Sequence, residues 1–429
     1  MGRKIWLAAA LIALAGCEQQ QQQQNAQAPD GAAELRAAAS DPRVAGFYRA
    51  RGWRTAWTRE SEAALTAAIG EAERHALDPA AFLGPVRAAA SPAARDAALS
   101  LAALTYAEAL ARGRTDPARI RRPYTLPRPG PDLARGLERA LGAGGDVGAW
   151  LRGLAPHDEE YRLLSEAYVA ANRQVVAAQG RPPPALLDRA RSLAVNLERR
   201  RWLEREPPAT RIDVNSGAAT LAYIRDGAVA DSRRVVVGEP GRETPELASP
   251  LYRLVANPTW TVPRSIEQSE IVPKGEAYMR RNHMERRDGW IVQQSGPRNS
   301  LGLVKFDLRN DEEIYLHDTP AKALFRESDR HASHGCVRVQ DALGFAAMIA
   351  ADAGVEEAWR EALAKGEETF VALPRPIPVR LFYHTAFVDH GRIVFAPDAY
   401  GWDEDVAEGL GLPRRPRPAA AVRGRDLGP

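Results

Sequence analysis

The chain has 429 residues, of which 45% are hydrophobic and 26% charged, with 34 Gly, 32 Pro and a formal net charge of +3. This length allows two or three domains with hydrophobic cores, and the composition excludes a disulfide-rich miniprotein, a fibre and a wholly disordered chain. The small net charge gives no indication of nucleic-acid binding, which usually needs a clustered basic surface.

Residues 1–17 have the pattern of a secretory signal. A short basic start precedes an apolar run, Ile5–Ala15, that is too short to span a bilayer. The ending at Cys17 resembles the bacterial lipobox, which implies cleavage before this cysteine and its lipidation. Because Glu18 follows Cys17, and not aspartate, we expect a chain anchored to the outer membrane at its periplasmic face. An ordinary secretion signal with an incidental cysteine is the alternative.

The next two segments indicate a tether and a helical domain. Residues 18–29 are rich in glutamine and offer no side chains for a core, so we expect a tether. Residues 30–206 are rich in Ala, Leu, Arg and Glu with helical periodicity, which predicts a scaffold domain. The expected helices cover residues 61–75, 93–112, 159–178 and 184–203.

The pattern changes after Pro208, and residues 210–405 are expected to form a mainly β domain, either a sandwich or a partly closed barrel. The predicted strands cover residues 211–214, 219–225, 228–237, 313–317, 379–388 and 392–395. A helix over 341–352, with Asp341 as its N-cap, is inserted among them. We interpret the polar, less regular segment 266–291 as a mobile flap, and the Pro- and Arg-rich residues 406–429 as a flexible tail. The fold class is therefore α+β.

A histidine-rich stretch leads to Cys336. His317, His331 and His334 precede this cysteine, and a lone cysteine near an imidazole is a candidate nucleophile. The imidazole and the N-terminus of the helix expected at 341 would lower the pKa of the thiol. Two alternatives stay open on spacing alone: a zinc site formed by the three histidines and Cys336, and an inert structural cysteine.

The run Ser333-His334-Gly335-Cys336-Val337-Arg338 resembles the signature of L,D-transpeptidases with a YkuD-type catalytic domain. His317, nineteen residues before Cys336, matches the second motif of this family. Further stretches are similar to its long periplasmic, YcbB-like branch: 257–263, 296–302 and 377–379. Long members of the branch commonly carry a peptidoglycan-binding module between scaffold and catalytic domain, and we identify none here.

The resemblance implies a role for each matched catalytic residue. Cys336 would be the nucleophile and His317 its base, with the imidazole ring held by the backbone carbonyl of Asp318. His334 would shape and polarise the site. Gly335, together with Cys336, would offer backbone N–H groups to an oxyanion.

Four further residues are candidates for binding the substrate. Arg338 would hold a substrate carboxylate or the local loop, and a structural ion pair is the alternative. Ser333 belongs to the same motif. Trp260 and Tyr315 could line the cleft or could be core aromatics. The resemblance implies no metal and no organic cofactor.

The implied activity is peptidoglycan L,D-transpeptidation. The Cys336 thiolate would attack the bond before the terminal D-alanine of a tetrapeptide stem, and an amine of a second stem would resolve the thioester into a 3→3 cross-link. Hydrolysis through the same thioester, as an L,D-carboxypeptidase or a wall-attachment hydrolase, is one alternative. A wall-binding scaffold with an idle catalytic domain is the other. The expected partners are stem peptides, and the membrane through lipidated Cys17.

Overall fold

The computed structural model describes residues 28–121 and 123–414. The chain divides into two compact units. One holds the described residues up to Arg114 with Pro129–Arg173 and Arg200–Trp202, and the other holds Thr115–Arg128, Gln174–Arg199 and the described residues from Leu203. The expected signal, Cys17 and most of the glutamine-rich segment lie outside the described residues, as do residues 415–429. None of the helices within 28–121 and 123–414 is long and apolar enough to cross a membrane.

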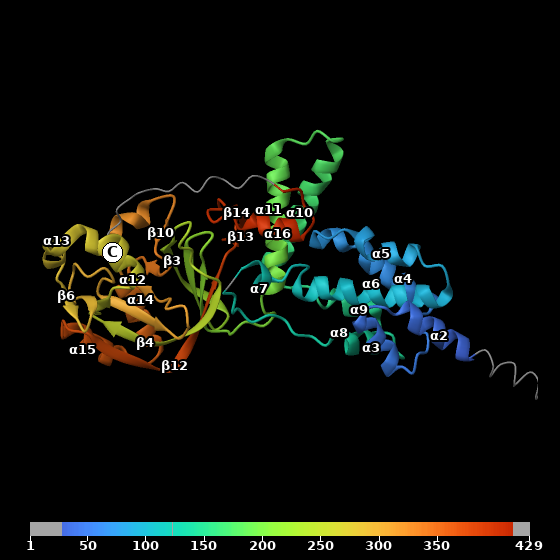
Figure 1. Cartoon of the computed structure of the whole chain (residues 1–429), viewed down its shortest axis with the longest axis horizontal. Helices are drawn as coiled ribbons and strands as arrows, with labels where there is room; N and C mark the ends of the chain where they lie inside the picture. Colours follow the sequence, from blue (N-terminus) through green and yellow to red (C-terminus); the bar gives the residue numbers. More distant parts are fainter. Residues whose placement is uncertain (1–27, 122, 415–429) are drawn as a thin grey trace, which may run out of the picture. The chain divides into compact units, whose positions relative to one another are not determined.

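The first unit is built from helices (Figure 1). They are α2 (Ala28–Ala38), α3 (Pro42–Ala50), α4 (Arg59–Gly70), the 3₁₀ helix η1 (Ala72–His75), α5 (Pro79–Arg87), α6 (Pro92–Arg112), α8 (Leu133–Ala140), α9 (Val147–Arg152) and most of α10 (Glu159–Ala177). The Ser91 hydroxyl caps α6 by accepting the Ala94 N–H, and Gly113 ends the helix at φ 82°. The helices expected at 93–112 and 159–178 are confirmed, whereas the one expected at 61–75 is divided into α4 and η1.

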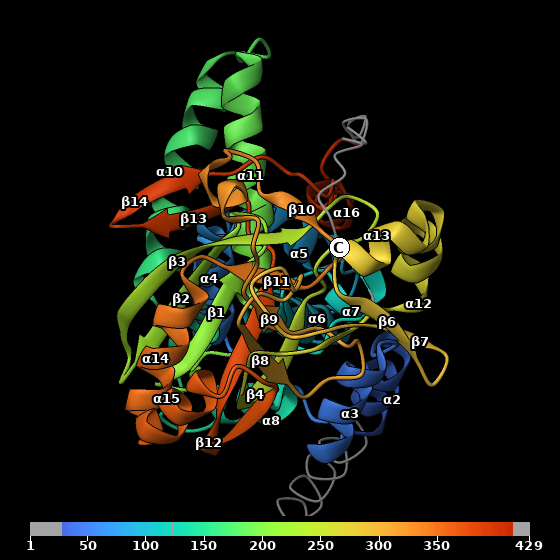
Figure 2. The same ribbon diagram turned by 90° about the vertical axis from the view of Figure 1, so that its left-hand side faces the viewer.

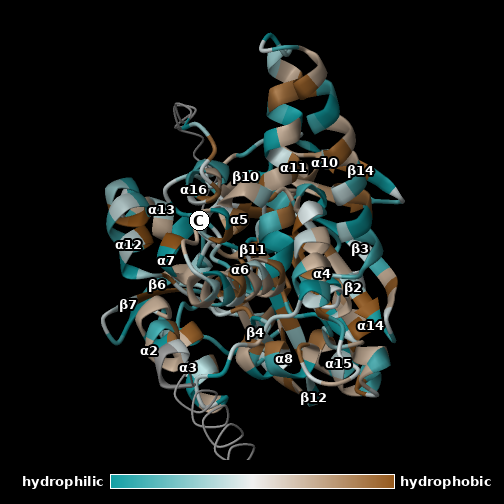
Figure 3. Cartoon of the chain, turned by 90° about the vertical axis from the view of Figure 1, so that its right-hand side faces the viewer, coloured by the Kyte–Doolittle hydropathy of each residue, from teal (hydrophilic) through white to brown (hydrophobic). Residues whose placement is uncertain are grey.

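Hydropathy follows the helical period along α10 and α11 (Pro184–Trp202). Hydrophobic and hydrophilic residues alternate around these ribbons, as amphipathic helices require (Figure 3). The expected helix at 184–203 is α11. Residues 174–199 fall in the second unit, so the expected domain limits at 30–206 and 210–405 stay predictions.

A nine-stranded mixed sheet dominates the second unit, in the order β10-β3-β11-β9-β8-β4-β12-β1-β2. β2 also pairs with β3, so hydrogen bonds close the strands from β3 to β2 into a ring, the barrel form of the expected β domain (Figure 2). The strands are β1 (Arg211–Asn215), β2 (Thr220–Arg225), β3 (Ala228–Gly238), β4 (Leu247–Ala256), β8 (Val304–Leu308), β9 (Leu316–His317), β10 (His331–Ser333), β11 (Val337–Val339) and β12 (Thr369–Phe382).

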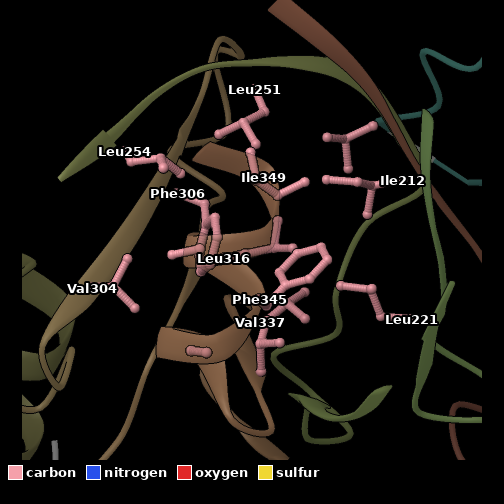
Figure 4. Close-up of a cluster of buried hydrophobic side chains, with 14 of the residues drawn as sticks. Ile212, Leu221, Leu251, Leu254, Val304, Phe306, Leu316, Val337, Phe345 and Ile349 are labelled. Atoms are coloured by element: carbon pink, nitrogen blue, oxygen red, sulfur yellow. The ribbon is translucent and has the colours of Figure 1, made fainter. Parts of the chain in front are cut away.

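The helix α14 (Ala342–Asp352) packs into the core that this sheet surrounds. Phe345 and Ile349 lie among apolar side chains of several strands, including Phe306 and Leu316 (Figure 4). Asp341 caps the helix as expected, through a hydrogen bond from the Gly344 N–H. A second helix, α15 (Glu356–Ala364), was not predicted.

The segment expected to be a mobile and less regular flap has regular secondary structure, so the expected irregularity was wrong, whereas its mobility stays a prediction. It contains α12 (Arg264–Ile266), the π-helix η2 (Glu267–Ile271), the 3₁₀ helix η3 (Val272–Lys274), α13 (Gly275–Arg281), β6 (Met284–Arg287) and β7 (Trp290–Gln293). β7 pairs with β6 and with β5 (Trp260–Thr261) in a separate three-stranded sheet. This segment, the cap, has a small apolar core of its own, which includes Ile271, Met279 and Ile291.

The structure also differs from two predictions near the C-terminus. The strand expected at 379–388 is two strands, the end of β12 and β13 (Ala386–Asp389), and β13 forms a hairpin with β14 (Arg392–Phe395). The expected flexible tail from residue 406 begins inside a helix, α16 (Asp403–Gly409), whose first turn carries three acidic residues that favour helix initiation.

Candidate active site

The pairing of β9 with β11 places the predicted catalytic side chains on one face of the sheet. The strands run parallel, and Arg338 is the register partner of His317. Cys336 lies directly before β11 and Tyr315 directly before β9, and both line the same cavity as Arg338 and His317. The residues between them point into the barrel core. The two motifs thus bring four side chains together, those of Tyr315, His317, Cys336 and Arg338.

This cluster lines a cavity of about 980 Å³. Seven of the sequence-predicted residues lie in its wall together with Arg338: Trp260, Tyr315, His317, Ser333, His334, Gly335 and Cys336. Asp318 is buried and is not part of the wall. Its carboxylate accepts the Leu303 N–H at 3.0 Å and pairs with Lys322, so it holds the loop behind His317.

Cys336 is a free cysteine that is partly exposed as a residue, whereas its sulfur is largely removed from solvent by its neighbours. Its Sγ lies 3.8 Å from the Glu313 carbonyl oxygen. Burial raises the pKa of Cys336, and this outweighs the opposing hydrogen bonds from Tyr315 and the positive charges of Lys305 and Arg338. The expectation of a lowered thiol pKa was therefore wrong.

His317 is 5% exposed, and the pKa of its imidazole is lowered to about 3. Burial is the main cause, and the neighbouring charge of Arg338 adds to it. Within residues 28–121 and 123–414, Nδ1 of His317 has no hydrogen-bond partner, so the expected hydrogen bond to the Asp318 backbone is not formed, although that backbone acts to raise the pKa of the ring. The imidazole is therefore neutral near pH 7 and can accept a proton.

The motif loop, which runs from Ser333 to Cys336, is held by short polar contacts. The Ser333 hydroxyl donates to the Cys336 carbonyl at 2.6 Å and accepts the Gly335 N–H at 3.2 Å. Gly335 adopts φ 114°, a conformation that side chains with a Cβ rarely take. Ser333 thus fixes the loop's shape and occupies the Gly335 N–H, so the expectation that this N–H is offered to an oxyanion was wrong.

His334 connects the motif loop to the cap. Its Nε2 lies 2.5 Å from Oε1 of Glu270, which belongs to η2. Arg242 donates to the same carboxylate oxygen at 2.9 Å. Burial opposes ionisation of Glu270, but these hydrogen bonds and charges together lower its pKa. The carboxylate therefore joins three separate loops at the cavity.

Arg338 is a buried cation with unsatisfied donors. It is 4% exposed, and its Nε and Nη1 have no hydrogen-bond partner within the described chain. Burial lowers the pKa of Arg338 below the usual value of an arginine, although nearby Cys336, Tyr315 and Glu270 favour the charged form. A buried guanidinium with free donors can bind an anion that enters the cavity.

The two predicted aromatic residues have different surroundings. Trp260 is 5% exposed and belongs to the apolar core of the cap. The Tyr315 ring packs edge-on against His317, with centroids 5.6 Å apart, and the Lys305 ammonium lies 4.3 Å from its centroid. Burial raises the pKa of Tyr315 well above its usual value, so the phenol stays protonated.

The histidines do not form the alternative zinc site. His331 binds the Ser216 carbonyl at 3.0 Å and Asp329 at 2.9 Å, outside the cavity wall. Within the described part of the chain, no three His, Cys, Asp or Glu side chains are placed to hold a metal ion.

Sequence reasoning missed several residues that shape this site. Lys305 and Asp307 reach the cavity from β8, where they form an ion pair at 2.8 Å. Glu270 and Thr244 act on the motif loop from distant segments. The alternation of Lys305 and Asp307 with apolar neighbours in β8 was the one available signal, and it needed the strand order to be informative.

Two regions of the chain match known family models. Residues 209–360 match the family model of the YkuD L,D-transpeptidase catalytic domain, and residues 42–167 match that of a scaffold domain. A Haemophilus influenzae protein, described by name as a candidate L,D-transpeptidase, is 32% identical over 219 residues, which cover 46% of this chain and 45% of that protein. The matched region therefore spans a little less than half of the relative.

Solved structures of L,D-transpeptidases are similar over part of the chain. The Mycobacterium smegmatis enzyme is 14% identical with a TM-score of 0.24 and coverage of 40% of this chain and 58% of its own. The Enterococcus faecium catalytic domain acylated by ertapenem is 15% identical with a TM-score of 0.23 and coverage of 41% and 99%.

Proposed function

We propose that the chain forms 3→3 cross-links between peptidoglycan stem peptides through a thioester on Cys336, since residues 209–360 match the family model of the YkuD L,D-transpeptidase catalytic domain. One observation carries the proposal: Cys336, directly before β11, lines the same cavity as His317 of β9 and the unsatisfied Arg338 of β11. The donor would be a tetrapeptide stem with a diamino acid at its third position and D-alanine at its fourth.

The first half-reaction forms the thioester. His317 takes the proton of the Cys336 thiol while Sγ attacks the carbonyl carbon of the third residue. The backbone N–H of Cys336 hydrogen-bonds the oxyanion. The carbon–nitrogen bond then breaks, His317 returns the proton to the departing amine, and D-alanine leaves.

The second half-reaction transfers the acyl group. The side-chain amine of an acceptor stem attacks the thioester, and His317 takes the proton that this amine loses. The carbon–sulfur bond breaks, and the proton returns to Cys336 as the thiol is restored. Because both partners start and finish uncharged, the buried site never has to hold an isolated thiolate at rest.

Arg338 would bind the terminal carboxylate of the donor's D-alanine. Its guanidinium, whose Nε and Nη1 have no hydrogen-bond partner within the described residues, can donate a charged hydrogen bond to this carboxylate. A substrate that ends in an amide would lack this charge. Binding of the carboxylate also satisfies donors that are unpaired in the free protein.

The cap would exclude water while the thioester waits for the acceptor. Glu270 fastens it to the motif loop through His334 and to the loop after β3 through Arg242. A looser cap would admit water, which hydrolyses the thioester and releases a tripeptide.

Product analysis tests the function. The purified chain is incubated with disaccharide-tetrapeptides, and the products are identified by mass. Cross-linked dimers with free D-alanine support transfer, and tripeptide monomers alone would establish the carboxypeptidase alternative. Cys336→Ala must form neither product, since activity in that variant would overturn the site assignment.

A matched pair of variants tests the cap. Glu270→Gln should raise the ratio of tripeptide to cross-linked dimer, because the neutral amide holds His334 and Arg242 less strongly. Glu276→Gln is the control, since Glu276 lies in α13 with its side chain 66% exposed, 3.8 Å from Arg286. Equal ratios in both variants would contradict the role of the Glu270 contact.

We also propose that Cys17 anchors the chain by lipid at the periplasmic face of the outer membrane. The lipobox-like ending supports this location. Membrane fractionation tests it: the Cys17→Ala chain should leave the outer-membrane fraction, and unchanged fractionation would refute the anchor.

A further inference from the structure

Thr244 occupies a buried position directly behind the motif loop. It is 0% exposed, and its hydroxyl donates to the Gly335 carbonyl oxygen at 2.7 Å. The same hydroxyl accepts the Gly238 N–H at 2.9 Å. A hydroxyl has one proton to donate, so these two contacts fix its direction.

This contact controls the orientation of the Gly335–Cys336 peptide. In a trans peptide the carbonyl and the following N–H point in opposite directions. Because Thr244 holds the Gly335 carbonyl, the Cys336 N–H is turned away from Thr244. This N–H has no hydrogen-bond partner within the described chain, so it is available to a reacting carbonyl.

The loop that carries Thr244 is itself held in place by Tyr400. The Thr244 N–H donates to the Tyr400 hydroxyl at 3.3 Å, and that hydroxyl donates to the Gly238 carbonyl at 2.7 Å. The Tyr400 ring stacks on Tyr383 with centroids 4.9 Å apart. At Gly238 a Cβ would lie 2.1 Å from the Arg242 carbonyl oxygen, so the loop is tightly closed.

We propose that Thr244 is a positioning residue that aims the Cys336 N–H at the oxyanion, with Tyr400 supporting it from behind. This inference rests on the proposed function, since it assumes acyl transfer to Cys336. A residue with this role acts on steps that create an oxyanion and leaves other reactions of the same sulfur unchanged.

Two reagents separate these effects. The β-lactam imipenem acylates a thiol through an oxyanion, whereas iodoacetamide alkylates it by direct displacement at carbon. Both rate constants are measured by intact mass on the full chain. In Thr244→Val we expect acylation of Cys336 to slow about 10–100-fold while alkylation changes less than about twofold. Thr244→Ser restores the hydroxyl and should bring acylation back to within about threefold of wild type.

Thr385→Val is the matched control. The Thr385 hydroxyl is also buried and also joins two polar groups, accepting from Asn196 and donating to Asp403, each at 2.8 Å. It lies outside the cavity wall, so both of its rate constants should equal those of wild type. If Thr244→Val does not fold, Tyr400→Phe provides the test, with a loss of about 3–10-fold in acylation alone.

Several results would contradict the positioning role of Thr244. Acylation and alkylation that fall together in Thr244→Val would assign Thr244 a general structural role and overturn the inference, as would two unchanged rates. Failure of Thr244→Ser to recover acylation would also count against it. If wild-type Cys336 is alkylated but never acylated, the proposed function fails first.

Discussion

Changing the pH tests whether Cys336 and His317 are uncharged at rest. Burial raises the pKa of Cys336 from 9.0 and lowers that of His317 to about 3. Fewer than about one molecule in a hundred should therefore carry a thiolate at pH 7, since each pH unit below the pKa reduces the ionised fraction about tenfold. Alkylation by iodoacetamide, which needs the thiolate, should accelerate about 100-fold from pH 6 to pH 8.

Acylation should respond differently, because a general base removes the thiol proton during the attack. Between pH 5 and pH 8 the thiol is protonated and the imidazole neutral, so acylation by a carbapenem should vary less than about twofold. Both rates are measured by intact mass on one preparation, with Cys336→Ala reporting any reaction at Cys17. Alkylation that is already maximal at pH 5 would refute the reasoning, because it would reveal a resting thiolate–imidazolium pair.

Four substitutions of single residues test other parts of the site and the fold. His317→Asn should slow acylation about 10²–10⁴-fold and leave alkylation nearly unchanged, which the same two assays check. Arg338→Met should raise the KM for tetrapeptide donors about 10–100-fold by removing charged hydrogen bonds, yet raise the melting temperature because an unsatisfied buried cation is lost; a lowered melting temperature would contradict this. Gly335→Ala should cost about 1–3 kcal/mol in urea unfolding and impair acylation, since residue 335 adopts φ 114°. Burial and the charge of Arg201 lower the pKa of His75 to about 3. As the pH falls below 6.5, the unfolded chain therefore binds a proton that the folded chain does not bind, and the folded state loses stability. The urea midpoint of unfolding should fall less from pH 7 to pH 4.5 in His75→Gln than in wild type.

The sequence was most informative where the chemistry is local. Helix α6 and strands β1 to β3 were predicted within one or two residues, because their periodicity and their turns lie in the same short window. The motif residues near Cys336 are also contiguous, so their proximity needed no knowledge of the fold.

Contacts between distant segments could not be predicted. Glu270 reaches His334 across 64 residues, and Thr244 reaches Gly335 across 91. The cap looked irregular because its polar side chains face outward from a small apolar core, and its short helices have no long repeat.

The direction in which the pKa of Cys336 is shifted could not be predicted from the sequence. Sequence shows which charges and helix ends are near a group, and each of these would favour a thiolate at Cys336. It does not show how much solvent the group loses, and that loss is the largest influence on both Cys336 and His317. The positive charges of Lys305 and Arg338 therefore did not decide the direction of the pKa shift of Cys336.

The burial that keeps the resting pair uncharged also bears on what the acyl-enzyme does next. A site that excludes water stabilises a neutral thiol and imidazole and at the same time denies a thioester its competing nucleophile. Transfer of the acyl group to an amine instead of water, and retention of the proton on the resting sulfur, then have the same cause, which is desolvation of the site. A change that opens the cap, such as loss of the Glu270 contact, should lower the pKa of Cys336 toward its ordinary value and increase hydrolysis together. If hydrolysis increases while the alkylation profile keeps its shape, water reaches the thioester by a route that does not solvate the sulfur, and the two properties are separable.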